Sequence, residues 1–292
     1  IVIDENWQFV CPHCLCELGV VQPCPRCGAE YSTRDGIHRF LLPVRFAEIQ
    51  PFLTQYRLVR EKDGYRSRSP DYYRSLPFVD RRDPQTDVWH VRAESFRNLC
   101  RWMGSVFGKR SLRILDLGAG NCWLSHRLSA AGHRLAAVDW LDDVEDGLSA
   151  GAFYPVRFTR VQADFDQLPV APGQFDLVIF NASLHYSPNA SGTLRRARQM
   201  LKRGGSVAVM DSPTFRSEEA GRRMVAELAG RLRAEYGLQT VVQQGVAFLT
   251  EKVLLDAGEQ LGLRVRFIPS RGRLGWAERR LAARVRLGRE AA

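Results

Sequence analysis

The chain has 292 residues, 45% hydrophobic and 25% charged, which is ordinary for a soluble globular protein with one large domain and a small one. No apolar run approaches the roughly 20 residues that span a bilayer, and no signal-peptide pattern is visible, so we expect no membrane span and a cytoplasmic location. The net charge is +10, and only four of the 42 basic residues are lysines. Such a surface attracts RNA or anionic membranes, but we favour the interpretation that the arginines are simply solvated.

Five cysteines lie between positions 11 and 27. Four of them form two C-x-x-C pairs, Cys11 with Cys14 and Cys24 with Cys27, and a proline follows the first cysteine of each pair. Two such turns that face each other present four thiolates tetrahedrally, as structural zinc prefers. Disulfides are the alternative, and the expected cytoplasmic location argues against them. We therefore predict a zinc site made by these four cysteines, with Cys16 left over.

The residues after the second pair continue the pattern as C-G-x-x-Y-x-x-x-D-G-I, with Gly28, Tyr31 and the stretch 35–37 at the defined positions. Over positions 8–43 the chain resembles the small zinc-ribbon proteins that activate tRNA and other methyltransferases. His38 stands where that family usually has proline. The resemblance implies that residues 1–44 are a zinc-ribbon module that packs on its own methyltransferase domain and stabilises it.

Residues 45–108 are rich in aromatic side chains and contain no linker rich in glycine or proline. Apolar residues from Val88 to Met103 have nearly helical spacing, so we expect a helical connecting segment or lid. If the domain that follows is a methyltransferase, as the ribbon's resemblance implies, such a segment is expected to lie over the cofactor and form one wall of the substrate pocket. The candidates for that wall are Tyr65, Tyr73, Trp89 and Arg92.

Positions 111–140 have the pattern of a nucleotide-binding unit. A short apolar strand leads into the turn G-A-G-N, a helical stretch follows, and a second apolar strand ends at Asp139. Glycines allow the backbone to approach a ligand, and the start of the helix offers free N–H groups. Asp139 is placed to accept hydrogen bonds from the two hydroxyls of a ribose.

Spacing decides which nucleotide-binding class this is. A dinucleotide fold requires G-x-G-x-x-G, and near the third glycine position this chain has Leu124. The stretch D-L-G-A-G, with Asp116 ahead of Gly118, instead resembles class I S-adenosylmethionine-dependent methyltransferases of the type 11 kind. Residues 109–292 are therefore expected to form an α/β, Rossmann-like, doubly wound methyltransferase domain.

Later motifs follow the same pattern in order: a third strand that ends at Asp164, a fourth over 174–186 that opens into the active site, and a helix, glycine turn and fifth strand over 200–213. The resemblance implies that S-adenosylmethionine is held by Asp116, Gly118, Ala119, Gly120, Asn121, Cys122, Asp139, Trp140, Asp164, Phe165 and Asn181. Cys122 occupies a position that is commonly glycine in the family.

The end of the chain is expected to complete the sheet only in part. Helical patterns cover 215–236 and 250–261, and alternating residues over 262–270 predict a sixth strand. The final residues lack a strand pattern, so we expect the seventh strand of the class to be absent, short or outside this sequence.

The acceptor is indicated by the residues after the fourth strand. Enzymes that methylate amide or base nitrogens usually have [D/N]-P-P-[Y/F] there, whereas this chain has N-A-S-L-H-Y. It is more similar to small-molecule methyltransferases of quinone and secondary-metabolite pathways, which act on a hydroxyl or an activated carbon. His185 would then be a base and Tyr186 would orient the substrate, but His185 could equally pack against the cofactor or cap the strand.

Two other functions stay open. An RNA methyltransferase, acting on tRNA or rRNA, is favoured by the net charge and by the kinship of the ribbon, and disfavoured by the acidic ribbon and the missing N-P-P-Y. A non-catalytic scaffold that kept the fold is disfavoured by the intact acidic and glycine motif.

Overall fold

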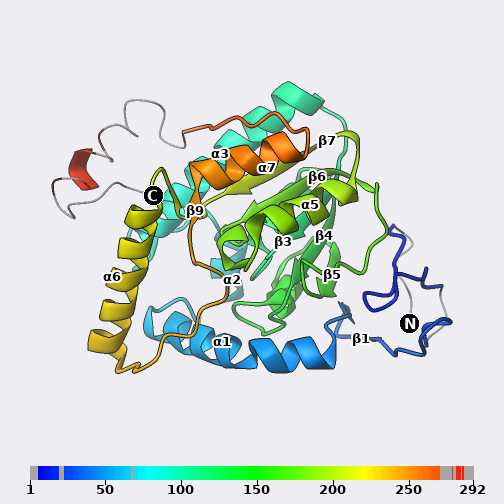
Figure 1. Cartoon of the computed structure of the whole chain (residues 1–292), viewed down its shortest axis with the longest axis horizontal. Coiled ribbons are helices and arrows are strands. Elements are labelled where there is room, and N and C mark those ends of the chain that lie inside the picture. Colours follow the sequence, from blue (N-terminus) through cyan, green and yellow to red (C-terminus); the bar gives the residue numbers. More distant parts are fainter. Residues whose placement is uncertain are drawn as a thin grey trace. The chain divides into compact units, whose positions relative to one another are not determined.

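The computed structural model describes residues 6–19, 23–66 and 69–269, together with Glu278, residues 281–283 and Val285. Figure 1 shows the helices and strands of the chain coloured along the sequence. By its internal contacts the chain divides into two compact units. The first comprises residues 1–76, 111–181 and 196–209, and the second comprises 77–110, 182–195 and 210–292. Within the described ranges, every helix is too short or too polar to cross a membrane.

The first unit is built on a seven-stranded sheet with the strand order β1-β2-β5-β4-β3-β6-β7. The strands are β1 Ser32–Arg34, β2 Ile37–Arg39, β3 Arg113–Leu117, β4 Arg134–Asp139, β5 Thr159–Gln162, β6 Phe175–Asn181 and β7 Leu201–Met210. β2, β5, β4, β3 and β6 pair in parallel, and β1 pairs antiparallel with β2. The middle strands β3 and β6 are short, mainly apolar runs that are buried except at Arg113 and Asn181, as expected for parallel strands between covering layers. The predicted α/β, Rossmann-like fold class is confirmed.

Strands β1 and β2 come from the cysteine-rich beginning of the chain. Ile37 to Arg39 pair with Arg160 to Gln162 of β5, and the backbone N–H of Phe40 extends the ladder to the Gln162 carbonyl at 2.7 Å. Upstream, Val10 donates to the Pro169 carbonyl at 2.9 Å. The N-terminal segment therefore covers the edge of β5, which would otherwise expose unpaired backbone groups.

Helical segments belong to the first unit together with these strands. The first unit contains α1 Pro43–Lys62, α2 Pro70–Ser75, α4 Trp123–Ala130 and the short 3₁₀ helix η1 Leu148–Phe153. α1 begins with proline in its first turn and continues through Pro51. The sequence pattern did not identify α1, because its apolar residues do not form one clear stripe.

The second unit contains α3 Thr86–Phe107, the 3₁₀ helix η2 Leu184–Tyr186, α6 Glu218–Tyr236, α7 Glu251–Gln260 and a two-stranded parallel sheet of β8 Thr214–Phe215 and β9 Leu249–Thr250. α5 Ala190–Met200 is shared between the two units. Ser217 and Thr250 cap α6 and α7 with their hydroxyls, which fixes both helices close to their predicted starts.

The sixth strand predicted over 262–270 is wrong for the residues described there. Residues 263–269 have no regular secondary structure, although their exposure alternates as far as Val265. Val265 packs instead against Gly258 of α7, where an added Cβ would lie 2.2 Å from its methyl group. Alternation alone does not make a strand without a ladder partner. Most of the tail in which a seventh strand was considered lies outside the described residues.

Candidate functional site

The glycine turn after β3 is held against the end of β4. The backbone N–H groups of Gly118 and Ala119 both donate to the Val138 carbonyl, at 2.8 and 3.0 Å. The N–H of Gly120 donates to Oδ2 of Asp139 at 2.8 Å. Both glycines have positive φ, 76° and 52°, so an L side chain would be strained at either position. The turn and the acid predicted to bind cofactor are therefore one hydrogen-bonded structure.

Cys122 closes this turn as the N-cap of α4. Its φ is 62°, in the left-handed region, which explains physically why glycine is the common residue here. The thiol is buried and contacts the Gly120 carbonyl at 3.6 Å. Burial raises the pKa of Cys122 well above its usual value, so the thiol stays neutral.

Two buried acceptor oxygens lie on neighbouring strands. Asp116 is fully buried, and its Oδ2 accepts from the Ser125 hydroxyl at 2.7 Å. Among the described residues, Asp116 Oδ1 and Asn181 Oδ1 have no hydrogen-bond partner. Asp116 pairs with Ile179, two residues before Asn181, so both side chains leave the same face of the sheet. Such unpaired buried oxygens are rare and suit a ligand that donates hydrogen bonds.

The carboxyl groups of this site ionise less readily than free aspartate. Burial raises the pKa of Asp116 to about 7, and the negative charge of Asp139 contributes. Burial also raises the pKa of Asp139 to about 6, although N–H donors from Leu141 and Gly120 oppose the shift. Both acids therefore titrate near neutral pH, which is typical of groups at functional sites.

An aromatic pair follows β4 and β5. Trp140 and Phe165 stack with their ring centroids 5.4 Å apart, and Arg45 from α1 lies 5.4 Å from the Trp140 ring. Arg45 Nε also donates to Oδ2 of the buried Asp164 at 2.6 Å. Arg45 was not predicted as a site residue, and no motif in the sequence marks it. It couples α1 directly to two of the predicted cofactor residues.

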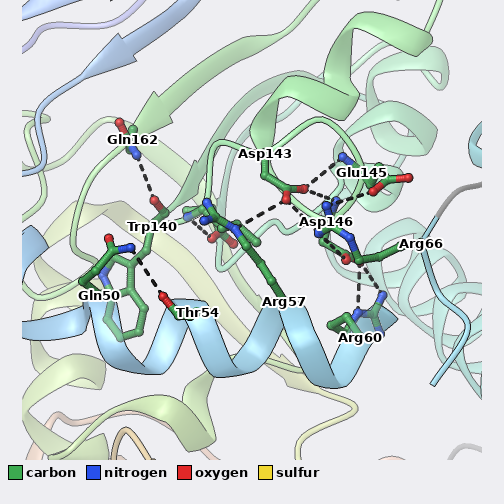
Figure 2. A network of polar contacts seen from close by, with 12 residues as sticks. Gln50, Thr54, Arg57, Arg60, Arg66, Trp140, Asp143, Glu145, Asp146 and Gln162 are labelled. Atoms are coloured by element: carbon green, nitrogen blue, oxygen red, sulfur yellow. Dashed lines mark hydrogen bonds and ion pairs between the residues drawn. The ribbon is translucent and has the colours of Figure 1, made fainter. Parts of the chain in front are cut away.

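Arginines near the end of α1 and just after it form ion pairs with the acidic loop after β4, as Figure 2 shows. Arg60 donates to Asp146 Oδ1 at 2.7 Å, and Arg66 bridges Asp143 at 2.7 Å and Glu145 at 2.8 Å. The Asp143 carboxylate also accepts from the backbone N–H of Asp146 at 2.7 Å. Desolvation opposes these charges, but the paired carboxylates raise the pKa of both arginines and keep them ionised. The network fixes the loop that leads away from Asp139.

The ion pair of Arg60 with Asp146 is nearly enclosed, with 14% and 2% of the side chains exposed. Replacing Arg60 by methionine removes the donor to Asp146 Oδ1, while Arg66 still lies 3.3 Å from Oδ2 of the same carboxylate, so we expect a loss of about 1–3 kcal/mol in unfolding free energy. Urea unfolding measures this loss. The matched control is Arg222→Met, which removes an exposed pair with Glu218 at 2.6 Å on α6. Equal effects of the two substitutions would contradict the assignment.

The four cysteines of the predicted zinc site come together. Their Sγ atoms all lie within 4.8 Å of one another, and the pairs Cys11–Cys27 and Cys14–Cys24 are each 3.6 Å apart. Tetrahedral zinc with Zn–S bonds of about 2.3 Å separates its sulfurs by about 3.8 Å, so the residues fit this metal. Their sulfurs could hold zinc with no change of fold.

The two cysteine turns are built alike. Leu15 and Gly28, each directly after its C-x-x-C pair, have positive φ values of 60° and 71°. Their N–H groups donate back to the carbonyls of Cys11 and Cys24 at 2.8 and 2.9 Å. Tyr31 places its hydroxyl 3.0 Å from the Cys11 sulfur. The Cys16 thiol contacts the Glu17 carbonyl at 3.6 Å and lies outside the cluster.

The two predicted catalytic residues belong to η2 in the second unit. His185 is buried, and its Nδ1 lies 3.2 Å from the Ser212 hydroxyl. Its ring is 4.1 Å from that of Tyr186. Burial, with help from the positive charge of Arg92, lowers the pKa of His185 to about 4, so the imidazole is neutral at pH 7. Of the predicted wall residues, Tyr65 and Tyr73 lie in the first unit and Trp89 and Arg92 in the second.

The predicted cofactor residues gather at one edge of the sheet. Asp164, Asp139, Gly118 and Asn181 follow or end the adjacent parallel strands β5, β4, β3 and β6, each at its carboxyl end. In open α/β sheets this edge is where ligands bind. A glycine turn, buried acids and stacked aromatic rings thus lie together at the carboxyl edge of the sheet.

Comparisons with known proteins agree with this geometry. Residues 115–209, about a third of the chain, match the family model of the methyltransferase domain. The malonyl-(acyl-carrier protein) O-methyltransferase of Erwinia pyrifoliae is 31% identical over 101 residues, which cover 33% of this chain and 36% of the relative. The ubiquinone biosynthesis O-methyltransferase of Aeromonas salmonicida is 27% identical over 176 residues, covering 56% of this chain and 66% of the relative. The chain therefore spans roughly a third to two thirds of the length of these relatives.

Among solved structures, magnesium protoporphyrin IX methyltransferase from Synechocystis with bound S-adenosylhomocysteine is similar, with a TM-score of 0.46 and 18% identity. That alignment covers 72% of this chain and 91% of the other chain.

Proposed function

We propose that this chain transfers a methyl group from S-adenosylmethionine to a hydroxyl or activated carbon of a small molecule. The observation that carries the proposal is the convergence of four predicted cofactor residues at the carboxyl ends of β3, β4, β5 and β6. The methyltransferase-domain match over residues 115–209 supports it independently. The names of the two relatives, both O-methyltransferases, favour an oxygen acceptor.

In this proposal each side chain has a separate role toward the cofactor. Asp139 accepts hydrogen bonds from the ribose hydroxyls, and the rings of Trp140 and Phe165 face the adenine beside Asp164. The unpaired oxygens of Asp116 and Asn181 receive the amino group of the methionine end. Bound S-adenosylmethionine supplies an already activated methyl group, so the protein mainly contributes orientation and exclusion of water.

His185 is proposed as the residue that removes the acceptor's proton. It is neutral at pH 7 and can accept a proton, but its pKa of about 4 makes it a weak base. We therefore expect His185→Ala to lower kcat by about 100-fold, at the low end for general bases, with cofactor affinity unchanged. Steady-state kinetics and calorimetry measure the two quantities. Full turnover by the variant would leave His185 a packing or capping residue.

The N-terminal module is proposed to be structural. Residues 1–44 would bind one zinc ion, pack on the chain's own methyltransferase domain and take no part in the chemistry. Contacts that support this role include Trp7, whose Nε1 donates to the Thr159 hydroxyl at 2.7 Å and whose ring stacks on Phe175 at 4.8 Å. The division into this module, a connecting segment over 45–108 and a methyltransferase domain over 109–292 is part of the proposal, as is the cytoplasmic location.

An assay with S-adenosylmethionine labelled in the methyl group tests the proposal. Total RNA and a small-molecule extract are offered separately, and we expect label in the extract. Label in RNA would support the RNA methyltransferase, whereas binding of cofactor without any transfer would support a scaffold. The ion pairs of Arg45, Arg60 and Arg66 argue against RNA as their partner, because these charges are neutralised within the first unit.

A further inference from the structure

Asp211, directly after β7, has an unusual environment in the second unit. Its φ is 54°, in the left-handed region that few residues other than glycine adopt. The Ser95 hydroxyl of α3 donates to Oδ1 at 2.6 Å. The other oxygen, Oδ2, is buried and has no hydrogen-bond partner among the described residues. A buried carboxylate oxygen without a donor is costly, so a reason for its presence is to be expected.

The backbone around Asp211 is fixed rather than loose. The N–H of Ala182, after β6, donates to the Met210 carbonyl at 2.8 Å, and the residue after Asp211, Ser212, contacts the His185 ring at 3.2 Å. The His185 carbonyl in turn accepts from the N–H of Ala247 at 3.1 Å. A strained residue that its surroundings hold in place is characteristic of a functional position.

Charged groups around Asp211 are also shared with His185. Arg92 of α3 lies with its guanidinium 4.8 Å from the Trp89 ring, and its positive charge acts on both Asp211 and His185. Burial raises the pKa of Asp211, while the Ser95 hydrogen bond and Arg92 oppose the shift. The positive charge of Arg92 thus acts on both the Asp211 carboxylate and the neutral His185 imidazole, and Ser212, the residue after Asp211, contacts that imidazole.

We propose that Asp211 binds the methyl acceptor, and that its Oδ2 accepts a hydrogen bond from a neutral hydroxyl group of that acceptor. This inference rests on the proposed function and names its substrate class. A carboxylate oxygen needs a donor, which excludes ethers and ketones as the group bound there. Arg92 repels an ammonium group and Asp211 itself repels a carboxylate, so both charges tolerate an uncharged donor, and the proposed oxygen acceptor makes that donor an O–H.

A stability test separates this role from a structural one. If Oδ2 exists to bind a ligand, Asp211→Asn removes a buried charge and keeps the acceptor for Ser95, so the melting temperature of the ligand-free protein stays equal or rises. The matched control is Asp256→Asn, an exposed aspartate of α7 paired with Lys252. A melting temperature several degrees lower for Asp211→Asn alone would make the residue structural and overturn the proposal.

A binding test uses three monosubstituted benzenes that differ in charge: phenol, benzylamine as a cation and benzoate as an anion. Calorimetry is performed on the full chain saturated with S-adenosylhomocysteine. We expect phenol to bind the wild type more tightly than the other two, and at least tenfold more weakly to Asp211→Asn, with Asp256→Asn unchanged. Arg92→Met is expected to improve benzylamine binding.

The outcomes are distinguishable. Failure of S-adenosylhomocysteine to bind the wild type would contradict the proposed function itself. Cofactor binding without saturable binding of phenol, or with equal phenol affinity in the wild type and Asp211→Asn, would overturn only the inference about Asp211. Preference for benzylamine or benzoate would overturn the neutral-hydroxyl class.

Discussion

Replacing Cys24 by serine is expected to release zinc and to destabilise the first unit, whereas replacing Cys16 leaves both zinc content and stability unchanged. Cys24 belongs to the group whose sulfurs lie within 4.8 Å of one another, and Cys16 does not. Binding of structural zinc contributes about 10–16 kcal/mol in small zinc modules, which is as large as the whole stability of a typical domain. Elemental analysis and thermal unfolding measure the two effects.

The loss is expected to spread beyond the cysteine turns because this segment completes the sheet. Residues 37–39 form β2 on the edge of β5, and Trp7 stacks on Phe175 of β6. Unfolding of the module would therefore expose a strand edge and an apolar surface, and we expect aggregation. Deletion of residues 1–44 should have the same result. A soluble and fully active deletion, or a Cys24→Ser protein that keeps its zinc, would contradict the structural role.

Lowering the pH from 7.5 to 5 is expected to weaken S-adenosylhomocysteine binding by at least about tenfold. Ribose hydroxyls donate to the ionised form of Asp139, and the pKa of this carboxyl is about 6 in the free protein. Below that pH each unit removes about tenfold of the binding-competent form. Calorimetry across this range measures the slope. The control Asp139→Asn should bind more weakly at pH 7.5 and lose its share of the slope.

Protonation of Asp116 and Asp139 is expected to raise the folding stability of the ligand-free protein, although it weakens cofactor binding. The pKa values of Asp116 and Asp139 are raised above those of the unfolded chain, so the native state binds more protons between pH 4 and 7. Their contribution to stability is therefore unfavourable above pH 7 and is relieved as the pH falls toward 4.

A cofactor affinity that is independent of pH from 5 to 7.5 would show that Asp139 does not hold the ribose.

The ends of the strands could be predicted from the sequence because each motif combines local signals. The Gly118–Gly120 turn, Asp139 and Asn181 follow short apolar runs, and in the structure all lie at the carboxyl edge of the sheet. The four cysteines were also predictable, since a fixed spacing and paired turns define their geometry locally. Cys122 occupies a position that is commonly glycine, and its positive φ explains that preference.

Contacts between distant segments could not be predicted in this way. Arg45 reaches Asp164 across 119 positions, and Ser95 reaches Asp211 across 116, without any motif that links them. The pairing of β2 with β5 also depends on which edge of the sheet is free to accept another strand. Alternation of apolar and polar residues predicts a strand but does not predict its partner. The prediction of a strand over 262–270 was wrong because the alternating pattern is present there but the described residues include no strand that pairs with it.

Titration of the purified chain with S-adenosylmethionine tests the central claim most directly. The account predicts saturable binding of one molecule per chain by calorimetry, weakened at least tenfold by Asp139→Ala and unaffected by Asp256→Asn. Absence of binding by the wild-type chain, or equal affinity in the Asp139 variant, would contradict it.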